Sequence, residues 1–278
     1  MGMGSELETK YGIGKDFFEG PNQILGFDIF EIMRNGTAED LRQTAVTQPS
    51  IFLYSLALWQ ASGSPTADAY AGHSLGEFSA LVASGCISLT AGLTLVKERA
   101  NAMQAACEEA KSTMAAVLGL DDAKVEEVCA GITQEIVVPA NYNTPGQLVI
   151  SGSIGGIELA AERLKEAGAK RVITLEVGGA FHSPFMASAQ VRLAAAVEAT
   201  EFAVPNGVIY QNVDAKPSRN PDEIKAKLVA QLTSPVRWAQ SVAAMAADGV
   251  DTFTEIGPGN VLQGLIKKIN KELVTAAL

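Results

Sequence analysis

The chain has 278 residues, and 47% of them are hydrophobic, which is enough to fill the core of one large domain or two smaller ones. A net charge of −10 argues against nucleic acid as a partner, and three cysteines without a C-x-x-C pair, with only two histidines, argue against disulfides and a metal site. Because no segment has the pattern of a membrane span or a signal peptide, we expect a cytoplasmic protein that does not bind membranes.

The N-terminal part of the chain gives few strong signals before residue 48. Residues 1–20 are rich in glycine and show no clear strand, which is unusual for an α/β protein. Residues 37–40 have the form of a helix-capping box. Residues 48–60 carry many apolar side chains and predict a buried helix that ends near Gly63.

The segment from Ala71 to Glu77 (AGHSLGE) fits a nucleophile elbow, a sharp turn from a strand into a helix with a serine at its tip. A buried strand is predicted at 66–71 and a helix at 77–83. We expect positions 72 and 76 to require residues as small as glycine, because strand and helix pass close together at such a turn. The helix would direct free N–H groups, beginning with that of Leu75, at an oxyanion formed on a carbonyl substrate.

A second helix is predicted at 91–107, capped by Thr90, with apolar positions 93, 96, 100, 103 and 107 on one face and Arg99 at its border. Shorter units follow: a strand at 113–118, a helix at 122–130, strands near 135–140 and 147–151, a helix at 155–167 and a strand at 170–177. This β-α-β-β-α-β order is typical of the ferredoxin-like unit. We therefore predict a small domain at 111–179, inserted into a large domain formed by 1–110 and 180–278.

A Gly-rich bend at 178–184 contains His182 and leads into an alanine-rich helix at 185–199. The remaining predictions are a strand at 207–213, helices near 221–232 and 237–247, a strand at 251–256 and a helix at 260–270. Strands that alternate with helices on this scale indicate a mainly parallel sheet with helices on both faces. The predicted class is α/β.

A serine needs a base to become a nucleophile, and the chain offers only His73 and His182. His73 is the neighbour of Ser74, and adjacent side chains point apart, so we expect it to pack against the sheet. His182 is the better base, although a loop histidine with satisfied hydrogen bonds is the alternative. The group that orients the imidazole is left open between Asp214 and a backbone carbonyl.

Eight ordered segments resemble one known family: 47–49, 71–77, 99–104, 141–147, 180–183, 212–214, 231–236 and 255–262. Their sequences are similar to those of malonyl-CoA:acyl-carrier-protein transacylases of bacterial type II fatty-acid synthesis, relatives of polyketide acyltransferase domains. The resemblance covers nearly the whole chain. It implies a hydrolase-like α/β domain with a ferredoxin-like insert, in agreement with the predicted elements.

The resemblance also implies a reaction. Ser74 would be the nucleophile and His182 its general base, with the main-chain carbonyl of Gln231, not Asp214, orienting the ring. Arg99 would bind the malonyl carboxylate, since a guanidinium matches a carboxylate bidentately; a salt bridge to an acidic neighbour is the alternative. Malonyl would pass from CoA to Ser74 and then to the phosphopantetheine thiol of acyl carrier protein.

Three further side chains take substrate-binding roles by resemblance: Asn141, Asn143 and Phe181. An Ala-Phe-His context at 180–182 goes with malonyl in polyketide relatives, so Phe181 favours malonyl over methylmalonyl. The implied enzyme needs no cofactor beyond its two substrates, and we expect a monomer.

The family begins with an apolar strand and a Gly-Gln-Gly loop whose glutamine N–H is a second oxyanion donor. Residues 1–4 resemble the stretch just after that loop, so we expect both to be missing here. Two other functions stay open. One is a serine esterase or thioesterase with water as acceptor, and the other is a catalytically weak module that binds acyl carrier protein.

Overall fold

The computed structural model describes residues 2–278, and its N-terminal part is helical. The first four helices of the chain are α1 (Met3–Tyr11), α2 (Lys15–Leu25), α3 (Ile29–Asn35) and α4 (Ala38–Arg42). They form because each presents apolar side chains to one shared core, among them Leu7, Phe18 and Phe30, all nearly inaccessible. The expected capping box is present, with Thr37 and Asp40 bonded reciprocally.

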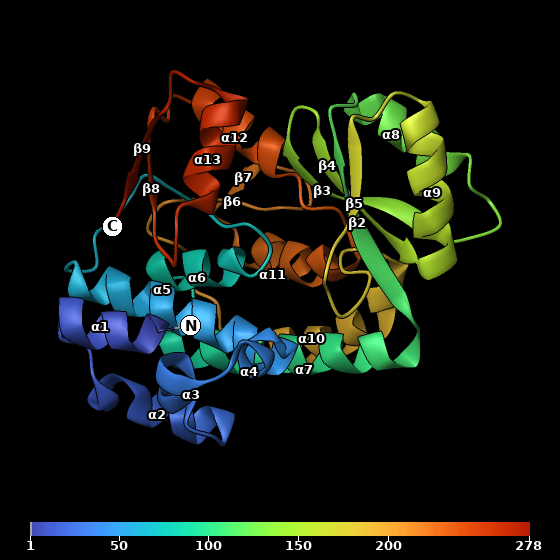
Figure 1. The fold of residues 1–278 in the computed structure, drawn as a ribbon. Helices are drawn as coiled ribbons and strands as arrows, with labels where there is room; N and C mark the ends of the chain where they lie inside the picture. The colour runs from blue at the N-terminus through green and yellow to red at the C-terminus, as the bar shows by residue number, and fades with distance from the viewer. Residues whose placement is uncertain (1) are drawn as a thin grey trace.

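Long helices form the base of the large domain (Figure 1): α5 (Thr44–Ala61), α7 (Leu89–Glu109) and α10 (Ala187–Glu198). Helix α5 begins four residues before the predicted position. Helix α7 is capped by Ser88, whose side chain accepts from the Ala91 N–H, so the prediction of Thr90 as the cap was wrong. The predicted helix at 185–199 is divided into a short 3-10 turn, η1 (Pro184–Met186), and α10.

The strands of the large domain lie in two small sheets. Strand β1 (Ala69–Ala71) pairs parallel with β6 (Val208–Tyr210), which pairs antiparallel with β7 (Pro217–Ser218). Strand β8 (Thr252–Glu255) pairs parallel with β9 (Val274–Ala277). The remaining elements are α6 (Gly76–Ala83), α11 (Pro221–Ala230), η2 (Gln231–Thr233), α12 (Trp238–Ala247) and α13 (Val261–Ile269). The two longer strand pairs, β1 with β6 and β8 with β9, are parallel as expected. They belong to two separate sheets, however, and not to one.

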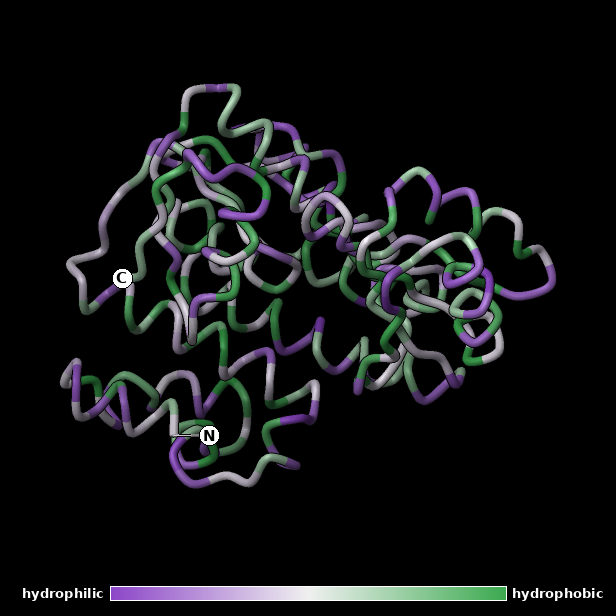
Figure 2. The backbone as a smooth tube through the Cα atoms, turned by 45° about the horizontal axis from the view of Figure 1, so that its top comes forward, coloured by the Kyte–Doolittle hydropathy of each residue, from purple (hydrophilic) through white to green (hydrophobic). Residues whose placement is uncertain are grey.

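Residues 112–174 form a four-stranded antiparallel sheet in the order β3-β4-β2-β5. Its elements are β2 (Ser112–Leu118), α8 (Asp122–Ala130), β3 (Val137–Thr144), β4 (Gln147–Ser153), α9 (Ile154–Glu166) and β5 (Arg171–Thr174). This is the connectivity and strand order of a ferredoxin-like unit. The unit has its own apolar core and forms a separate lobe in Figures 1 and 2. Domain limits at 111 and 179 stay a prediction.

The small sheet is bonded directly to the large domain. The Tyr142 N–H donates to the Val236 carbonyl at 2.9 Å, and the Val236 N–H donates to the Ala140 carbonyl at 2.8 Å. The hydroxyl of Ser151 on β4 donates to the Phe181 carbonyl, and the Ala180 N–H donates to the hydroxyl of Ser112 on β2. The small domain therefore holds the bend that contains His182. Within residues 2–278 no helix is long and apolar enough to cross a membrane.

Candidate active site

Ser74 lies at the tip of the turn between β1 and α6, with its backbone in the left-handed region at φ 53°. The turn is tight on one side only. A Cβ at Gly72 would lie 1.9 Å from the Gly76 carbonyl carbon, whereas a Cβ at Gly76 would meet nothing within 4 Å. The expectation that both glycines are needed for close approach was therefore right for Gly72 and wrong for Gly76.

The hydroxyl of Ser74 lies 2.8 Å from Nε2 of His182, and Nδ1 of the same ring lies 2.9 Å from the main-chain carbonyl of Gln231. A carbonyl only accepts, so Nδ1 carries the proton and Nε2 presents its lone pair to the serine. His182 is 4% exposed, and its backbone is also left-handed, at φ 57°. Burial, with the nearby charge of Arg99, lowers the pKa of His182 to about 3, so the ring is neutral near pH 7.

Asp214, one of the two candidates for orienting the ring, is engaged elsewhere. Its carboxylate lies 2.9 Å from Nζ of Lys227 and accepts from the Lys216 N–H. His73, which we expected to pack against the main sheet, is bonded to the small domain. Its Nε2 lies 2.9 Å from Oδ1 of Asn143 on strand β3 of the small domain.

Arg99 of α7 is 1% exposed and reaches the nucleophile. Its Nη2 donates to Oγ of Ser74 at 2.9 Å and to Oε1 of Gln231 at 3.2 Å, and its Nη1 donates to Oε1 of Gln48 at 2.5 Å. Burial lowers its pKa to about 10, so the guanidinium is still charged at neutral pH. The structure thus brings a buried cation to within hydrogen-bond distance of the serine oxygen.

Sequence reasoning missed an amide and carboxylate network beneath the serine. Oδ1 of Asn212 accepts from the Ser74 N–H at 2.7 Å, and Nδ2 of Asn212 donates to the Gly72 carbonyl. Nε2 of Gln231 donates to the Ser74 carbonyl and to the carboxylate of Glu77. The position of Asn212 was a usable signal, since it follows β6, the parallel neighbour of the strand that leads into the elbow.

The other predicted residues lie around this centre. No acceptor within residues 2–278 pairs with the Leu75 N–H, which is the first amide after the serine. Oδ1 of Asn141 is buried without a hydrogen-bond partner among the described residues, and the Phe181 side chain packs between the two domains' apolar clusters. A pocket of about 250 Å³ opens beside His73 and Asn143, and its other lining residues are Gln147, Val261, Leu262 and Leu265.

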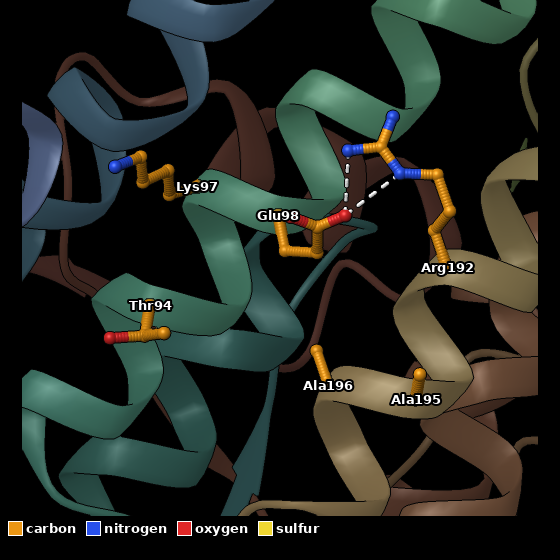
Figure 3. Close-up of a pocket in the computed structure, with 6 residues that line it drawn as sticks. All are labelled: Thr94, Lys97, Glu98, Arg192, Ala195 and Ala196. Carbon is orange, nitrogen blue, oxygen red and sulfur yellow. Dashed lines mark hydrogen bonds and ion pairs between the residues drawn. The ribbon is translucent and has the colours of Figure 1, made fainter.

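A larger pocket of about 520 Å³ lies between α7 and α10 and does not include the serine (Figure 3). The two basic side chains that line it, Arg192 and Lys97, already have partners. Arg192 pairs with Glu98 at 2.7 Å, and Lys97 donates to the Ile24 carbonyl at 2.7 Å. Although Arg99 follows Glu98 on the same helix, its guanidinium bonds Ser74 and Gln48. We assign no catalytic role to this pocket.

Comparisons with known proteins agree with this geometry. Residues 20–277 match the family described as the acyl transferase domain. The chain is 40% identical to the malonyl CoA-acyl carrier protein transacylase of Escherichia coli K12, over 100% of this chain and 91% of that protein. A crystal structure of an acyl carrier protein S-malonyltransferase from Vibrio cholerae is similar with a TM-score of 0.94 at 39% identity, covering 100% of this chain and 92% of that one.

A second solved structure is a malonyl-transacylase in complex with a type II polyketide acyl-carrier protein. It is similar with a TM-score of 0.95 at 37% identity, over 100% of this chain and 91% of that one. The family match spans most of the chain, and the relatives are similar over all of it. The chain therefore belongs to the acyl transferase family, among the malonyl CoA-acyl carrier protein transacylases.

Proposed function

We propose that this enzyme transfers a malonyl group from malonyl-CoA to the phosphopantetheine thiol of an acyl carrier protein, through an ester on Ser74. The observation that carries the proposal is the 2.9 Å hydrogen bond from the buried Arg99 guanidinium to the oxygen of Ser74. In a malonyl thioester one methylene separates the carboxylate from the carbonyl carbon. A carboxylate bound to Arg99 therefore brings that carbon close to the nucleophile.

In the first half of the reaction, Oγ of Ser74 attacks the thioester carbonyl while its proton passes to Nε2 of His182. The Gln231 carbonyl accepts from Nδ1–H, which keeps Nε2 free to take the proton and stabilises the imidazolium that forms. The oxyanion lies at the start of α6, where the Leu75 N–H is available to donate. Collapse of the adduct breaks the carbon–sulfur bond, and the CoA sulfur takes the proton from His182.

In the second half, the carrier-protein thiol gives its proton to Nε2 of His182 and attacks the malonyl ester. Collapse returns the proton to Oγ of Ser74 and leaves malonyl on the carrier thiol. The charges balance without a cofactor, since the serine and histidine supply the nucleophile, the base and the acid. The acceptor thiol and the CoA thiol follow the same path in opposite directions, so one channel serves both.

The pocket beside His73 fits the arm that carries this thiol. Its walls combine amides, Asn143 and Gln147, with apolar side chains from α13. The phosphopantetheine arm has the same alternation of amide and methylene groups. Asn141, two residues before Asn143 on β3, has a buried side-chain oxygen without a partner among the described residues, and we assign it to an N–H of the arm. We assign the preference for malonyl over its branched analogue to Phe181, which directly precedes the base in sequence. The structure of a related transacylase with an acyl-carrier protein supports that class of partner.

The test is intact-protein mass spectrometry after mixing with malonyl-, acetyl- or succinyl-CoA, followed by phosphopantetheinylated carrier protein. We expect a malonyl adduct that disappears in Ser74→Ala and moves to the carrier. Arg99→Leu should lose malonyl loading by at least about 100-fold and keep slow acetyl loading, because only malonyl uses the guanidinium. An adduct released to water instead of the carrier would identify an esterase or thioesterase. Equal loss of both acyl groups in Arg99→Leu would contradict the carboxylate-binding role.

A further inference from the structure

Glu77 is a fully buried carboxylate three residues after the nucleophile, and the reaction above does not use it. Its Oε1 accepts from Nε2 of Gln211 at 2.9 Å. Its Oε2 accepts from the Asn212 N–H at 2.9 Å and from Nε2 of Gln231 at 3.1 Å. All its donors are neutral amides, which is unusual for a buried carboxylate, because such a group ordinarily pairs with a cation.

Arg99 shows the complementary feature. None of the ion pairs within residues 2–278 includes it, although it is 1% exposed and charged at neutral pH. The two buried charges are joined by one side chain. Nη2 of Arg99 donates to Oε1 of Gln231 at 3.2 Å, and Nε2 of the same amide donates to Oε2 of Glu77. The amide dipole of Gln231 thus has its negative end at the cation and its positive end at the anion.

We propose that Glu77 is the counter-charge of Arg99, coupled to it through the side-chain amide of Gln231, and that it sets how tightly and up to what pH the site holds a carboxylated acyl group. A direct ion pair would occupy the guanidinium edge that the substrate carboxylate needs. With the amide interposed, the charge of Glu77 still balances that of Arg99, and the guanidinium edge is left to weaker acceptors, the Ser74 hydroxyl and Oε1 of Gln48, which a carboxylate displaces. The inference rests on the proposed role of Arg99.

The titratable groups around this pair are few. Helix α6 contributes Glu77, α7 contributes Arg99, and the bend before η1 contributes His182, with His73 of the elbow acting on His182 from farther away. The other side chains of the cluster are all neutral: Gln48 of α5, Gln211 and Asn212 just after β6, and Gln231 of η2. Burial lowers the pKa of Arg99, and the charge of Glu77 opposes that effect. The same burial raises the pKa of Glu77.

The test compares Glu77→Gln with Glu77→Asp. The first removes the charge and keeps the shape, and the second keeps the charge and shortens the reach. We measure the rate of Ser74 acylation by malonyl-CoA and acetyl-CoA from pH 6 to pH 10.5. The rate of malonyl acylation falls at alkaline pH as Arg99 loses its proton, and we call this decline the alkaline fall. In Glu77→Gln we expect the alkaline fall to occur at a pH about one unit lower, with no such shift for acetyl-CoA. At pH 7 free malonate should inhibit this variant several-fold more strongly, because a nearby negative charge is gone.

Glu77→Asp should slow both acyl donors and keep the alkaline fall of the unaltered enzyme. If Glu77→Gln does not fold, Gln231→Met tests the same coupling, since it removes the bridging amide and keeps the main-chain carbonyl at His182. It should shift the alkaline fall in the same direction. An unshifted alkaline fall, or weaker inhibition by malonate, would overturn the inference. Failure of the unaltered enzyme to prefer malonyl over acetyl would overturn the proposed function itself.

Discussion

Substitution of the two glycines of the elbow should have opposite effects on stability. A Cβ built at Gly72 lies 1.9 Å and 2.1 Å from the Gly76 carbonyl carbon and oxygen and 2.4 Å from the Glu77 nitrogen, whereas ordinary contact starts at 3.4 Å. Strand and helix would have to separate by about 1.5 Å, and no flexible side chain can move instead. We expect Gly72→Ala to cost about 3 kcal/mol, the upper end for overpacking a core.

Gly76→Ala is the matched control. It adds the same methyl group four residues away, at the first position of α6, where nothing lies within 4 Å. Alanine is the better helix former, so this variant should be as stable as the parent or gain up to about 1 kcal/mol. For a chain of this size 1 kcal/mol corresponds to about 2–4 °C in Tm, so Gly72→Ala should lose about 6–12 °C.

The assay is thermal unfolding by circular dichroism together with the rate of Ser74 acylation by malonyl-CoA. A displacement of about 1 Å at a reacting group costs about 100-fold, so acylation in folded Gly72→Ala should fall at least that far. Two results would refute the reasoning. One is a Gly72→Ala protein with the parent's Tm and rate, and the other is a Gly76→Ala protein that is destabilised as much.

Two further predictions follow from side chains at the site. The pKa of His182 is lowered from 6.5 to about 3, so its neutral form stabilises the fold above pH 6.5, and this stability is lost as the pH falls toward 3. The unaltered protein should therefore lose up to about 1.4 kcal/mol per pH unit over that range relative to His182→Gln, measured by urea unfolding; parallel stability curves would contradict it. Asp214→Asn should leave acylation within about twofold and cost less than about 1 kcal/mol, because the Lys227 pair is partly exposed. A loss on the order of 10⁴, typical of a triad aspartate, would restore Asp214 to the site.

The sequence predicted elements best where the periodic signal was strong. The order of the small domain's strands and helices followed from alternating patterns and short turns, and each boundary differs from the structure by only a few residues. Helices α1, α2 and α3 were missed, and two of them, α1 and α2, follow glycines at 2 and 14 that supply no side-chain cap. Strand β9 was missed because its partner, β8, lies some twenty residues earlier and no local pattern marks the pairing.

For the candidate site, the small number of histidines in the chain was the most useful signal. With two histidines in the chain, the elbow serine pointed to His182, and the structure places the two side chains 2.8 Å apart. Contacts between residues far apart in the sequence could not be predicted from local sequence patterns. The amide of Gln231 meets the Ser74 carbonyl from 157 residues away, and Asn212 reaches the same serine from 138 residues away. Only the folded chain identifies these partners, because amides carry no charge or periodic pattern that marks them in sequence.

The hydrogen bonds between the small sheet and the large domain limit what can be exchanged. The ferredoxin-like unit is one continuous segment with its own apolar core, so its replacement by the corresponding unit of another acyltransferase would look simple. Its strand β3, however, is hydrogen-bonded to Val236 of the large domain through the backbones of Ala140 and Tyr142, and the Ser151 hydroxyl donates to the carbonyl of Phe181, the residue before the base. A graft that fits by shape but lacks the serine at that position of β4 would fold and leave His182 poorly oriented. Chimaeras of this enzyme should therefore be joined within the large domain, so that β4 and residues 178–183 come from the same parent.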